Sequence, residues 1–177
     1  GGLGSASWQY TSAAGQKVTV AALAAVNPMG SVLMPETGCF WAWPFAQEGE
    51  LGAARLPSAP LAARADFVMP GDGPAPANTT LVVVATDAAL DKAQAQRVAI
   101  MAQDGLARAI RPIHSPFDGD VVICVSTEKV AIDGSPQEIA QIGHHAADCA
   151  ARAIARGVYE ADSIGDWQSY RDRFAAA

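Results

Sequence analysis

The sequence predicts an α/β fold, because its second half reads as strand, helix, strand and helix in succession. Two apolar runs rich in β-branched residues, 80–86 and 121–126, have the length and composition of buried strands. A long helical pattern follows each run, and each pattern opens with a capping signal. This alternation of strands and helices is typical of α/β domains.

The composition is that of one globular domain. Of the 177 residues, 50% are hydrophobic and 17% are charged, which gives enough apolar material for one sizeable core. The net charge of −6 argues against nucleic acid and against an anionic membrane surface as partners. No apolar run approaches the ~20 residues that a membrane-spanning helix needs. We therefore expect neither nucleic acid nor a membrane among the partners.

The cysteines and histidines do not form a metal-binding pattern. Cys39, Cys124 and Cys149 are odd in number, lack metal-type spacing and lie in apolar surroundings. They are expected to be small buried hydrophobic residues in a reducing, cytoplasmic compartment. His144 and His145 are adjacent, so a helix would point them about 100° apart. We expect no metal and no cofactor.

The first third of the chain predicts one clear strand. Residues 1–7 form a glycine- and serine-rich segment that we interpret as a lead-in to the domain. Residues 17–26 predict a buried strand, with valines supplying the β-branching. The turn signal Asn-Pro-Met-Gly at 27–30 ends this strand.

A shorter strand pair is predicted next, at 31–34 and 39–43, around the turn-forming residues 35–38. An alternation of aromatic residues follows along the second of these strands, and it is explained either by core packing or by the wall of a substrate pocket. The residues that alternate are Trp41, Trp43 and Phe45. Residues 55–78 then hold five prolines and few aliphatic residues, which predicts an exposed, mobile linker.

Two capped helices are predicted in the second half. Asp91, with Gln94 three residues later, forms a capping box that starts the first helix, and Arg111-Pro112 ends it. One face of this helix is apolar or small, formed by Val98, Met101, Ala102, Gly105 and Ala109.

The second helix is predicted to start at Ser135 and to run to about Arg156, where Gly157 stops it. His145 falls on its polar side and is expected to be solvated. His144 lies beside alanines and is expected to pack against the domain.

The junction of Asn78 with Thr79 suits a peptide bond that its own downstream side chain cuts. If the Thr79 hydroxyl attacks the Asn78 carbonyl, the amide becomes an ester that hydrolyses and leaves Thr79 as a new N-terminus. The α-amine of Thr79, with an unperturbed pKa of about 8, could then act as general base for its own hydroxyl. The alternative is a loop followed by a strand that begins with threonine, a good strand former.

Asp118 and Asp120 flank a glycine directly before the 121–126 strand. Two carboxylates at a strand end could hold an N-terminal ammonium group or orient the Thr79 hydroxyl. The alternative is an ordinary turn in which the two carboxylates are simply solvated.

Several further motifs accompany this junction: a strand after Asn78-Thr79-Thr80, DGLARAIRP at 104–112, His114 and FDGD at 117–120, with additional matches at 1–5 and 26–28. Together they resemble the DmpA-type self-processing aminopeptidases. That family includes L-aminopeptidase/D-amidase-esterases, β-peptidyl aminopeptidases and hydrolases of 6-aminohexanoate (nylon) oligomers. The resemblance covers nearly the whole chain and is strongest over 74–127.

The resemblance implies a role for each candidate residue. Thr79 would be the nucleophile of both self-cleavage and substrate hydrolysis, with Asn78-Thr79 as the cleavage site. Asp118 and Asp120 would orient that nucleophile and its amine, and both are aspartates in the nylon-oligomer hydrolases. Asn27 matches a strand-end asparagine whose amide could donate to the reacting carbonyl oxygen.

The implied fold is a four-layer αββα sandwich similar to N-terminal-nucleophile hydrolases, of which this chain would be a partial domain. Family members are about twice as long, and they carry a lysine and a tyrosine upstream of the segment that matches residues 1–2. Residues 1–78 would be the end of the large subunit and 79–177 the small subunit, together forming one structural domain. The implied partners are a small peptide or amide substrate, the chain's own cleaved subunit and further processed protomers in a homo-oligomer.

Two other functions remain open. Self-cleaving ornithine acetyltransferases have a comparable architecture and also use a threonine nucleophile, although their threonine motif differs. An inactive fragment or a binding protein is the other alternative, because the upstream lysine and tyrosine are absent from this chain.

Overall fold

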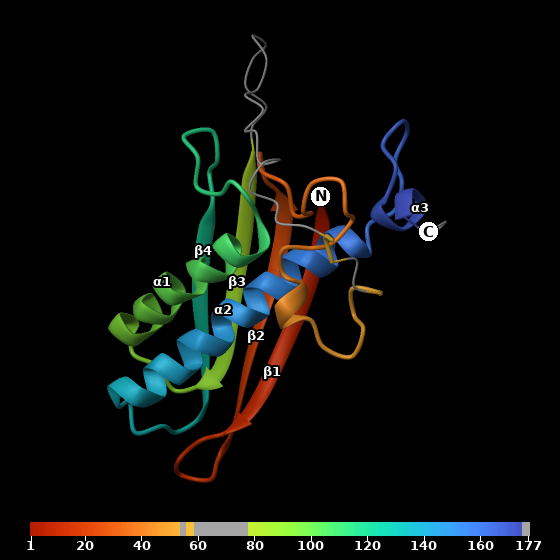
Figure 1. Cartoon of the computed structure of the whole chain (residues 1–177). Helices are drawn as coiled ribbons and strands as arrows, with labels where there is room; N and C mark the ends of the chain where they lie inside the picture. The colour runs from red at the N-terminus through yellow and green to blue at the C-terminus, as the bar shows by residue number, and fades with distance from the viewer. Residues whose placement is uncertain (54–55, 59–77, 175–177) are drawn as a thin grey trace.

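A computed structural model of the chain describes residues 1–53, 56–58 and 78–174. Its centre is a four-stranded mixed sheet with strand order β1-β2-β3-β4 (Figure 1). The strands are β1 (Gly2–Thr11), β2 (Lys17–Asn27), β3 (Thr79–Ala88) and β4 (Val121–Val130). The helices are η1 (Trp43–Phe45), α1 (Lys92–Ala109), α2 (Pro136–Tyr159) and α3 (Tyr170–Phe174).

The strands pair in two ways. β1 with β2 and β2 with β3 are antiparallel, whereas β3 with β4 is parallel and is connected through α1. Both long helices lie side by side on one face of the sheet (Figure 1). The predicted α/β class and the strand, helix, strand, helix order of the second half are therefore confirmed.

The interpretation of residues 1–7 as a lead-in is wrong, because residues 2–11 form β1, an edge strand of the sheet. Its glycines serve a tertiary contact. A Cβ atom at Gly4 would lie 2.2 Å from the Ala153 carbonyl oxygen and 2.3 Å from the Gly157 nitrogen, so only glycine lets β1 approach α2 this closely. Gly157 likewise packs against β1 instead of ending the helix, which continues to Tyr159.

The predicted helix starts are confirmed. Asp91 accepts the Gln94 amide in a full capping box, and the Ser135 hydroxyl accepts the Glu138 amide with proline in the first turn. The segments predicted as a strand pair, 31–34 and 39–43, do pair antiparallel, but only through the isolated bridge of Leu33 with Phe40 and not as two strands. The aromatic segment Trp43–Phe45 forms the short 3-10 helix η1, which has proline in its first turn.

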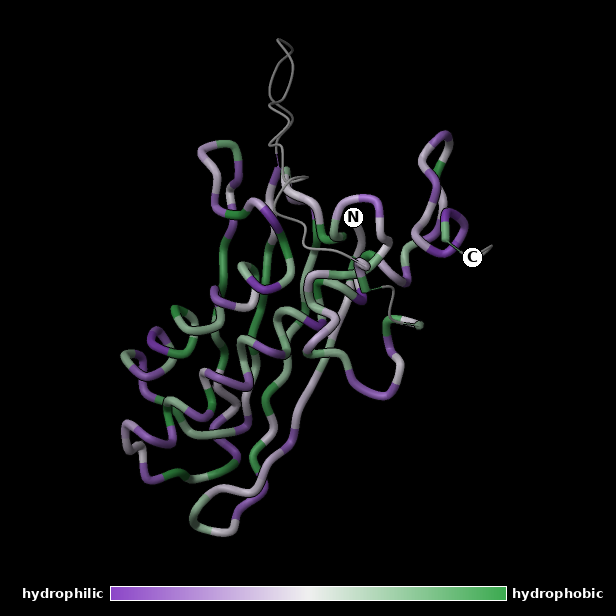
Figure 2. The backbone as a smooth tube through the Cα atoms, in the orientation of Figure 1, coloured by the Kyte–Doolittle hydropathy of each residue, from purple (hydrophilic) through white to green (hydrophobic). Residues whose placement is uncertain are grey.

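The linker predicted over 55–78 lies almost entirely outside the described residues. The core of the described part lies between the sheet and the helices, where strand valines meet helix leucine and isoleucine. Its fully buried members include Val18, Val20, Val82, Val84, Leu106, Ile142 and Ile154. Figure 2 shows hydrophobic residues along the central strands and on the helix sides that face them.

The opposite face of the sheet is apolar and exposed. Alternate residues of all four strands point away from the helices, and large aliphatic side chains are at least 37% exposed there. They are Leu3, Leu23, Leu81, Val83, Val121, Ile123 and Val125. One helix layer with one sheet layer whose outer face is apolar corresponds to half of a four-layer αββα sandwich. No helix in the described ranges is long and apolar enough to cross a membrane.

Candidate active site

Thr79 is the first residue of β3, at the end of the sheet where β2 finishes and β4 begins. It is half-buried and shares the open sheet face with Leu81, because alternate residues of a strand point the same way. Its hydroxyl donates a hydrogen bond to the carbonyl oxygen of Asn78 at 2.6 Å. The predicted nucleophile thus lies against the carbonyl group that it would attack.

Asn27 lies directly opposite Thr79 in the antiparallel register of β2 and β3. Cross-strand partners of this kind have side chains on the same face of the sheet. The structure therefore brings Asn27 beside Thr79, at the rim of the open apolar face.

The parallel pairing of β3 with β4 brings the Asp-Gly-Asp segment to the same corner. Asn78 forms a bridge with Asp118, and the Gly119 amide donates to the Asn78 carbonyl oxygen at 2.9 Å. That oxygen consequently accepts two hydrogen bonds, one from Gly119 and one from Thr79.

The Asp120 carboxylate holds the backbone next to Thr79. Its Oδ1 accepts the Thr80 amide at 2.8 Å, and its Oδ2 lies 2.9 Å from Nδ1 of His114. The Asp120 side chain is only 3% exposed, whereas the His114 side chain that it faces is 41% exposed. His114 has a left-handed φ of 55°, which a non-glycine residue adopts at a cost.

The Asp118 carboxylate points to other neighbours. Its Oδ1 accepts the Met29 amide at 3.0 Å, and its Oδ2 accepts the Ser115 hydroxyl at 2.5 Å. Asp118 therefore links the loop after β2 to the turn before β4. The Thr79 hydroxyl, which Asp118 was expected to orient, donates to the Asn78 carbonyl oxygen instead.

Sequence reasoning missed Met29, Ser115 and Gly119 as parts of this corner. Ser115 carried a local signal, since serine is a common turn residue whose hydroxyl bonds the backbone two residues on, here the Phe117 amide. The contributions of Met29 and Gly119 are backbone amides, and their partners depend on which strands pair.

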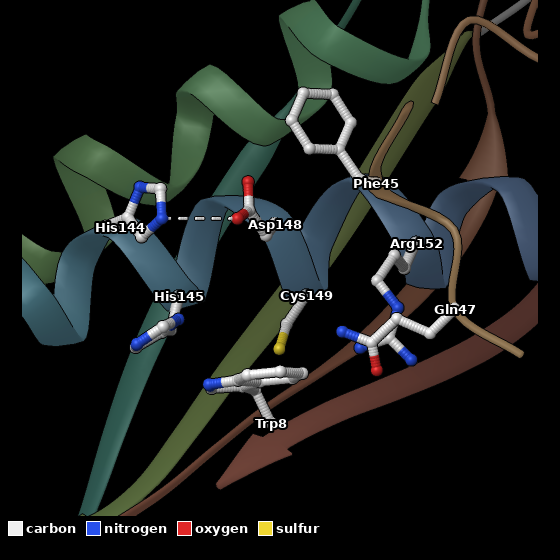
Figure 3. A pocket seen from close by; sticks show the side chains of 8 residues that line it. All are labelled: Trp8, Phe45, Gln47, His144, His145, Asp148, Cys149 and Arg152. Carbon is white, nitrogen blue, oxygen red and sulfur yellow. Dashed lines mark ion pairs between the residues drawn. The ribbon is translucent and has the colours of Figure 1, made fainter. Parts of the chain in front are cut away.

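A second cluster of polar residues lines a cavity of about 180 Å³ beneath α2 (Figure 3). Trp8, which lines this cavity, is two residues before the buried Tyr10 in β1, so both side chains point toward the helices. The cavity therefore lies on the helix side of the sheet, whereas Thr79 lies on the other side. Its charged groups are paired with one another or with nearby residues: Arg152 binds Glu50, and Asp148 binds Arg108.

The expectations for the two histidines are reversed in the structure. His145 stacks on Trp8 with ring centroids 5.7 Å apart. Its pKa is lowered, mainly by burial and to a smaller extent by the nearby His144. His144 has a 61% exposed side chain and faces Asp148 across one helical turn. The reason is that β1, read as a lead-in, supplies the aromatic surface on which His145 packs.

Cys39 and Cys149 are buried and Cys124 is partly buried, as expected of small hydrophobic residues. Burial raises the pKa of the Cys149 thiol to about 11. Within the described ranges, no group of three or more histidine, cysteine or acidic side chains could hold a metal ion.

Comparison with known proteins identifies the family. The model of peptidase family S58 matches residues 1–170. An uncharacterized aminopeptidase of Mycobacterium tuberculosis is 42% identical over 188 residues, which cover 100% of this chain and 53% of the relative. An uncharacterized aminopeptidase of Mycobacterium leprae is 38% identical over 196 residues, covering 100% of this chain and 49% of the relative.

Two solved structures have the same fold. A protein from Pyrococcus horikoshii superposes with a TM-score of 0.59 at 26% identity, over 96% of this chain and 43% of that protein. The L-aminopeptidase D-Ala-esterase/amidase of Ochrobactrum anthropi superposes with a TM-score of 0.57 at 18% identity, over 94% of this chain and 42% of that protein. It is described as a variant of the N-terminal-nucleophile hydrolase fold. This fold is the one that the resemblance implied.

The chain spans about half the length of the curated relatives that it matches. Nearly its whole length falls within the family model, and the motifs at 78–80 and 117–120 lie inside that match. The chain therefore belongs to peptidase family S58, the DmpA-type aminopeptidases.

Proposed function

We propose that the protein is a self-processing amide hydrolase in which Thr79 first cuts the bond after Asn78 and then serves as N-terminal nucleophile. The observation that carries this proposal is the 2.6 Å hydrogen bond between the Thr79 hydroxyl and the Asn78 carbonyl oxygen. This contact supports the proposal, because the Thr79 hydroxyl lies beside the carbonyl group that it would attack in the uncut chain.

The first reaction is an acyl shift from nitrogen to oxygen. The Thr79 Oγ forms a bond to the Asn78 carbonyl carbon, the C–N bond breaks, and the hydroxyl proton ends on the Thr79 nitrogen. Water then hydrolyses the resulting ester, which leaves a carboxylate on Asn78 and a free amine and hydroxyl on Thr79. One water molecule is consumed, and no other reactant is required.

The second reaction uses the amine made by the first. A free α-amine has a pKa of about 8, so Thr79 can supply both nucleophile and general base. The hydrogen bond from the Thr80 amide to Asp120 would hold this new N-terminus in place after the cut. Asn27, opposite Thr79 in the register, is the candidate donor to the substrate's carbonyl oxygen.

Both pieces of the cut chain would stay together. β3 begins at the cut, yet it pairs with β2 from Val20 to Asn27, and α2 packs on both β1 and β2. The two subunits would thus share one sheet and one core. The substrate class that fits is a small amide or peptide with a free amine, as in the aminopeptidase names of the relatives.

A threonine acyltransferase of the ornithine acetyltransferase type is the competing function. The two differ in the acyl acceptor, which is water in a hydrolase and an amine in a transferase. Turnover of aminoacyl p-nitroanilides and 6-aminohexanoate oligomers by the full-length protein, without an added acceptor, supports hydrolysis. Turnover that begins only when glutamate is added as acceptor contradicts it.

The nucleophile is tested by variants of Thr79. Thr79→Ala should abolish hydrolysis, whereas Thr79→Ser should keep part of it because the hydroxyl remains. An alanine variant with wild-type turnover would remove Thr79 from the reaction.

A further inference from the structure

We propose that the backbone amide of Gly119 is the donor that stabilises the oxyanion of self-cleavage, and that position 119 lacks a side chain to leave room for the Thr79 hydroxyl. This inference rests on the proposed self-cleavage after Asn78. It assigns a part in that reaction to the residue between the two aspartates.

The first argument is the hydrogen bonding of the Asn78 carbonyl oxygen. In the uncut chain this oxygen accepts the Gly119 amide at 2.9 Å and the Thr79 hydroxyl at 2.6 Å. When the Thr79 oxygen bonds to the carbonyl carbon, its own hydrogen bond to that oxygen is lost. The Gly119 amide then remains as the donor to the developing negative charge. Its 2.9 Å contact with the carbonyl oxygen before the reaction starts it close to the 2.7–3.1 Å that an oxyanion-hole donor keeps to the oxyanion itself.

The second argument is that both neighbours of Gly119 are anchored. Asp118 is bound by the Met29 amide and the Ser115 hydroxyl, and Asp120 is bound by the Thr80 amide and faces His114. A donor fixed before the reaction needs no reorganisation during it, which is what makes such a donor effective. The two carboxylates are thereby positioning residues for the amide between them.

The third argument is the space beside Gly119. A Cβ atom at this position would lie 2.9 Å from the Thr79 Oγ and 3.8 Å from the Asn78 carbonyl oxygen. The φ angle of Gly119 lies outside the left-handed range, so its backbone does not itself demand glycine. The absence of a side chain matters here because the nucleophile occupies that space.

The amide is tested by replacing Gly119 with glycolate in the full-length protein, which turns the amide into an ester and removes only the N–H. The self-cleavage rate, followed by intact mass, should fall by about 10²- to 10³-fold, the usual loss for one oxyanion donor. Glycolate at Gly15 is the matched control, since the Gly15 amide also donates to a carbonyl at 2.9 Å, in the β1–β2 turn. That control should cleave at the wild-type rate.

The space is tested by thermal unfolding in backgrounds that cannot cleave. Gly119→Ala should lower the melting temperature when Thr79 is valine, which keeps a γ atom facing position 119, and much less when Thr79 is alanine. Equal effects in the two backgrounds would overturn the spatial argument.

The outcomes separate the inference from the function on which it rests. A wild-type protein that stays uncut overturns the proposed self-cleavage and this inference with it. A wild-type protein that is cut after Asn78, with the Gly119 ester cut at the same rate, overturns the inference alone.

Discussion

Removal of the Asp120 carboxylate should loosen the backbone next to Thr79, the proposed nucleophile. In Asp120→Ala, the Thr80 amide loses the acceptor at 2.8 Å, and no water replaces it because Thr80 is fully buried. A buried donor left without a partner costs about 1–3 kcal/mol. For a protein of this size, that corresponds to a fall in melting temperature of roughly 2–12 °C.

Asp120→Asn is the matched control for this change. Its amide oxygen can still accept the Thr80 amide, so stability should fall by less than about 1 kcal/mol. The side facing His114 changes from acceptor to donor, however, so self-cleavage and turnover should still fall, roughly 10²-fold if the carboxylate acts in proton transfer.

The assay is thermal unfolding in a Thr79→Ala background, combined with cleavage and turnover rates in the Thr79 background. The reasoning predicts that the alanine variant loses both stability and rate, whereas the asparagine variant loses mainly rate. Equal stability of the two variants, or wild-type turnover in both, would refute it.

Three further predictions address the base, the buried ion pair and the close contact of β1. Selective acetylation of the Thr79 amine should abolish activity, whereas His114→Gln should stay active with its pH profile intact; the reverse result would make the mechanism a threonine–histidine one. Arg152→Ala should destabilise the protein by about 1.5–3 kcal/mol, because the largely buried Glu50 loses its charged hydrogen-bond donor and keeps only the longer ion pair with Arg156 at 3.9 Å. Burial alone would raise the pKa of Glu50, but the hydrogen bond from Arg152 leaves that pKa below its ordinary value of 4.5. The ion pair therefore stabilises the folded protein above about pH 4.5, and this stabilisation is lost as the pH falls below that value. The loss should be absent in Glu50→Gln. Gly4→Ala should lower the melting temperature by far more than Ser5→Ala on the exposed face, and equal effects would contradict the packing of β1 on α2.

Local signals predicted the starts of the two long helices correctly. The capping box of Asp91 with Gln94 and the serine-proline start at Ser135 each involve residues within one turn, so a short stretch of sequence contains all the information. The β-branched strands of the second half were equally clear, because both are apolar on two faces in this chain.

The errors came from tertiary contacts. The glycines at the start of the chain look like a flexible segment, yet Gly4 is there because α2 lies against it. The same contact explains His145, which would be solvated on an isolated helix but stacks on Trp8 of β1. Helical periodicity cannot show which strand covers a given side.

Only the parts of the candidate site that are local in sequence were predictable. Asn78 and Thr79 are adjacent, and the Asp-Gly-Asp segment is local, so each could be found from the sequence. The partners of Asp118 depend on β2 ending beside β4, and this long-range arrangement appears only in the folded sheet.

The central claim is tested most directly by the intact mass of the purified full-length protein, with the N-terminal sequence of each chain present. The account predicts two chains, the smaller beginning at Thr79, and a single uncut chain in Thr79→Ala. A wild-type protein that hydrolyses amides as one uncut chain, or that is cut at another bond, would contradict it.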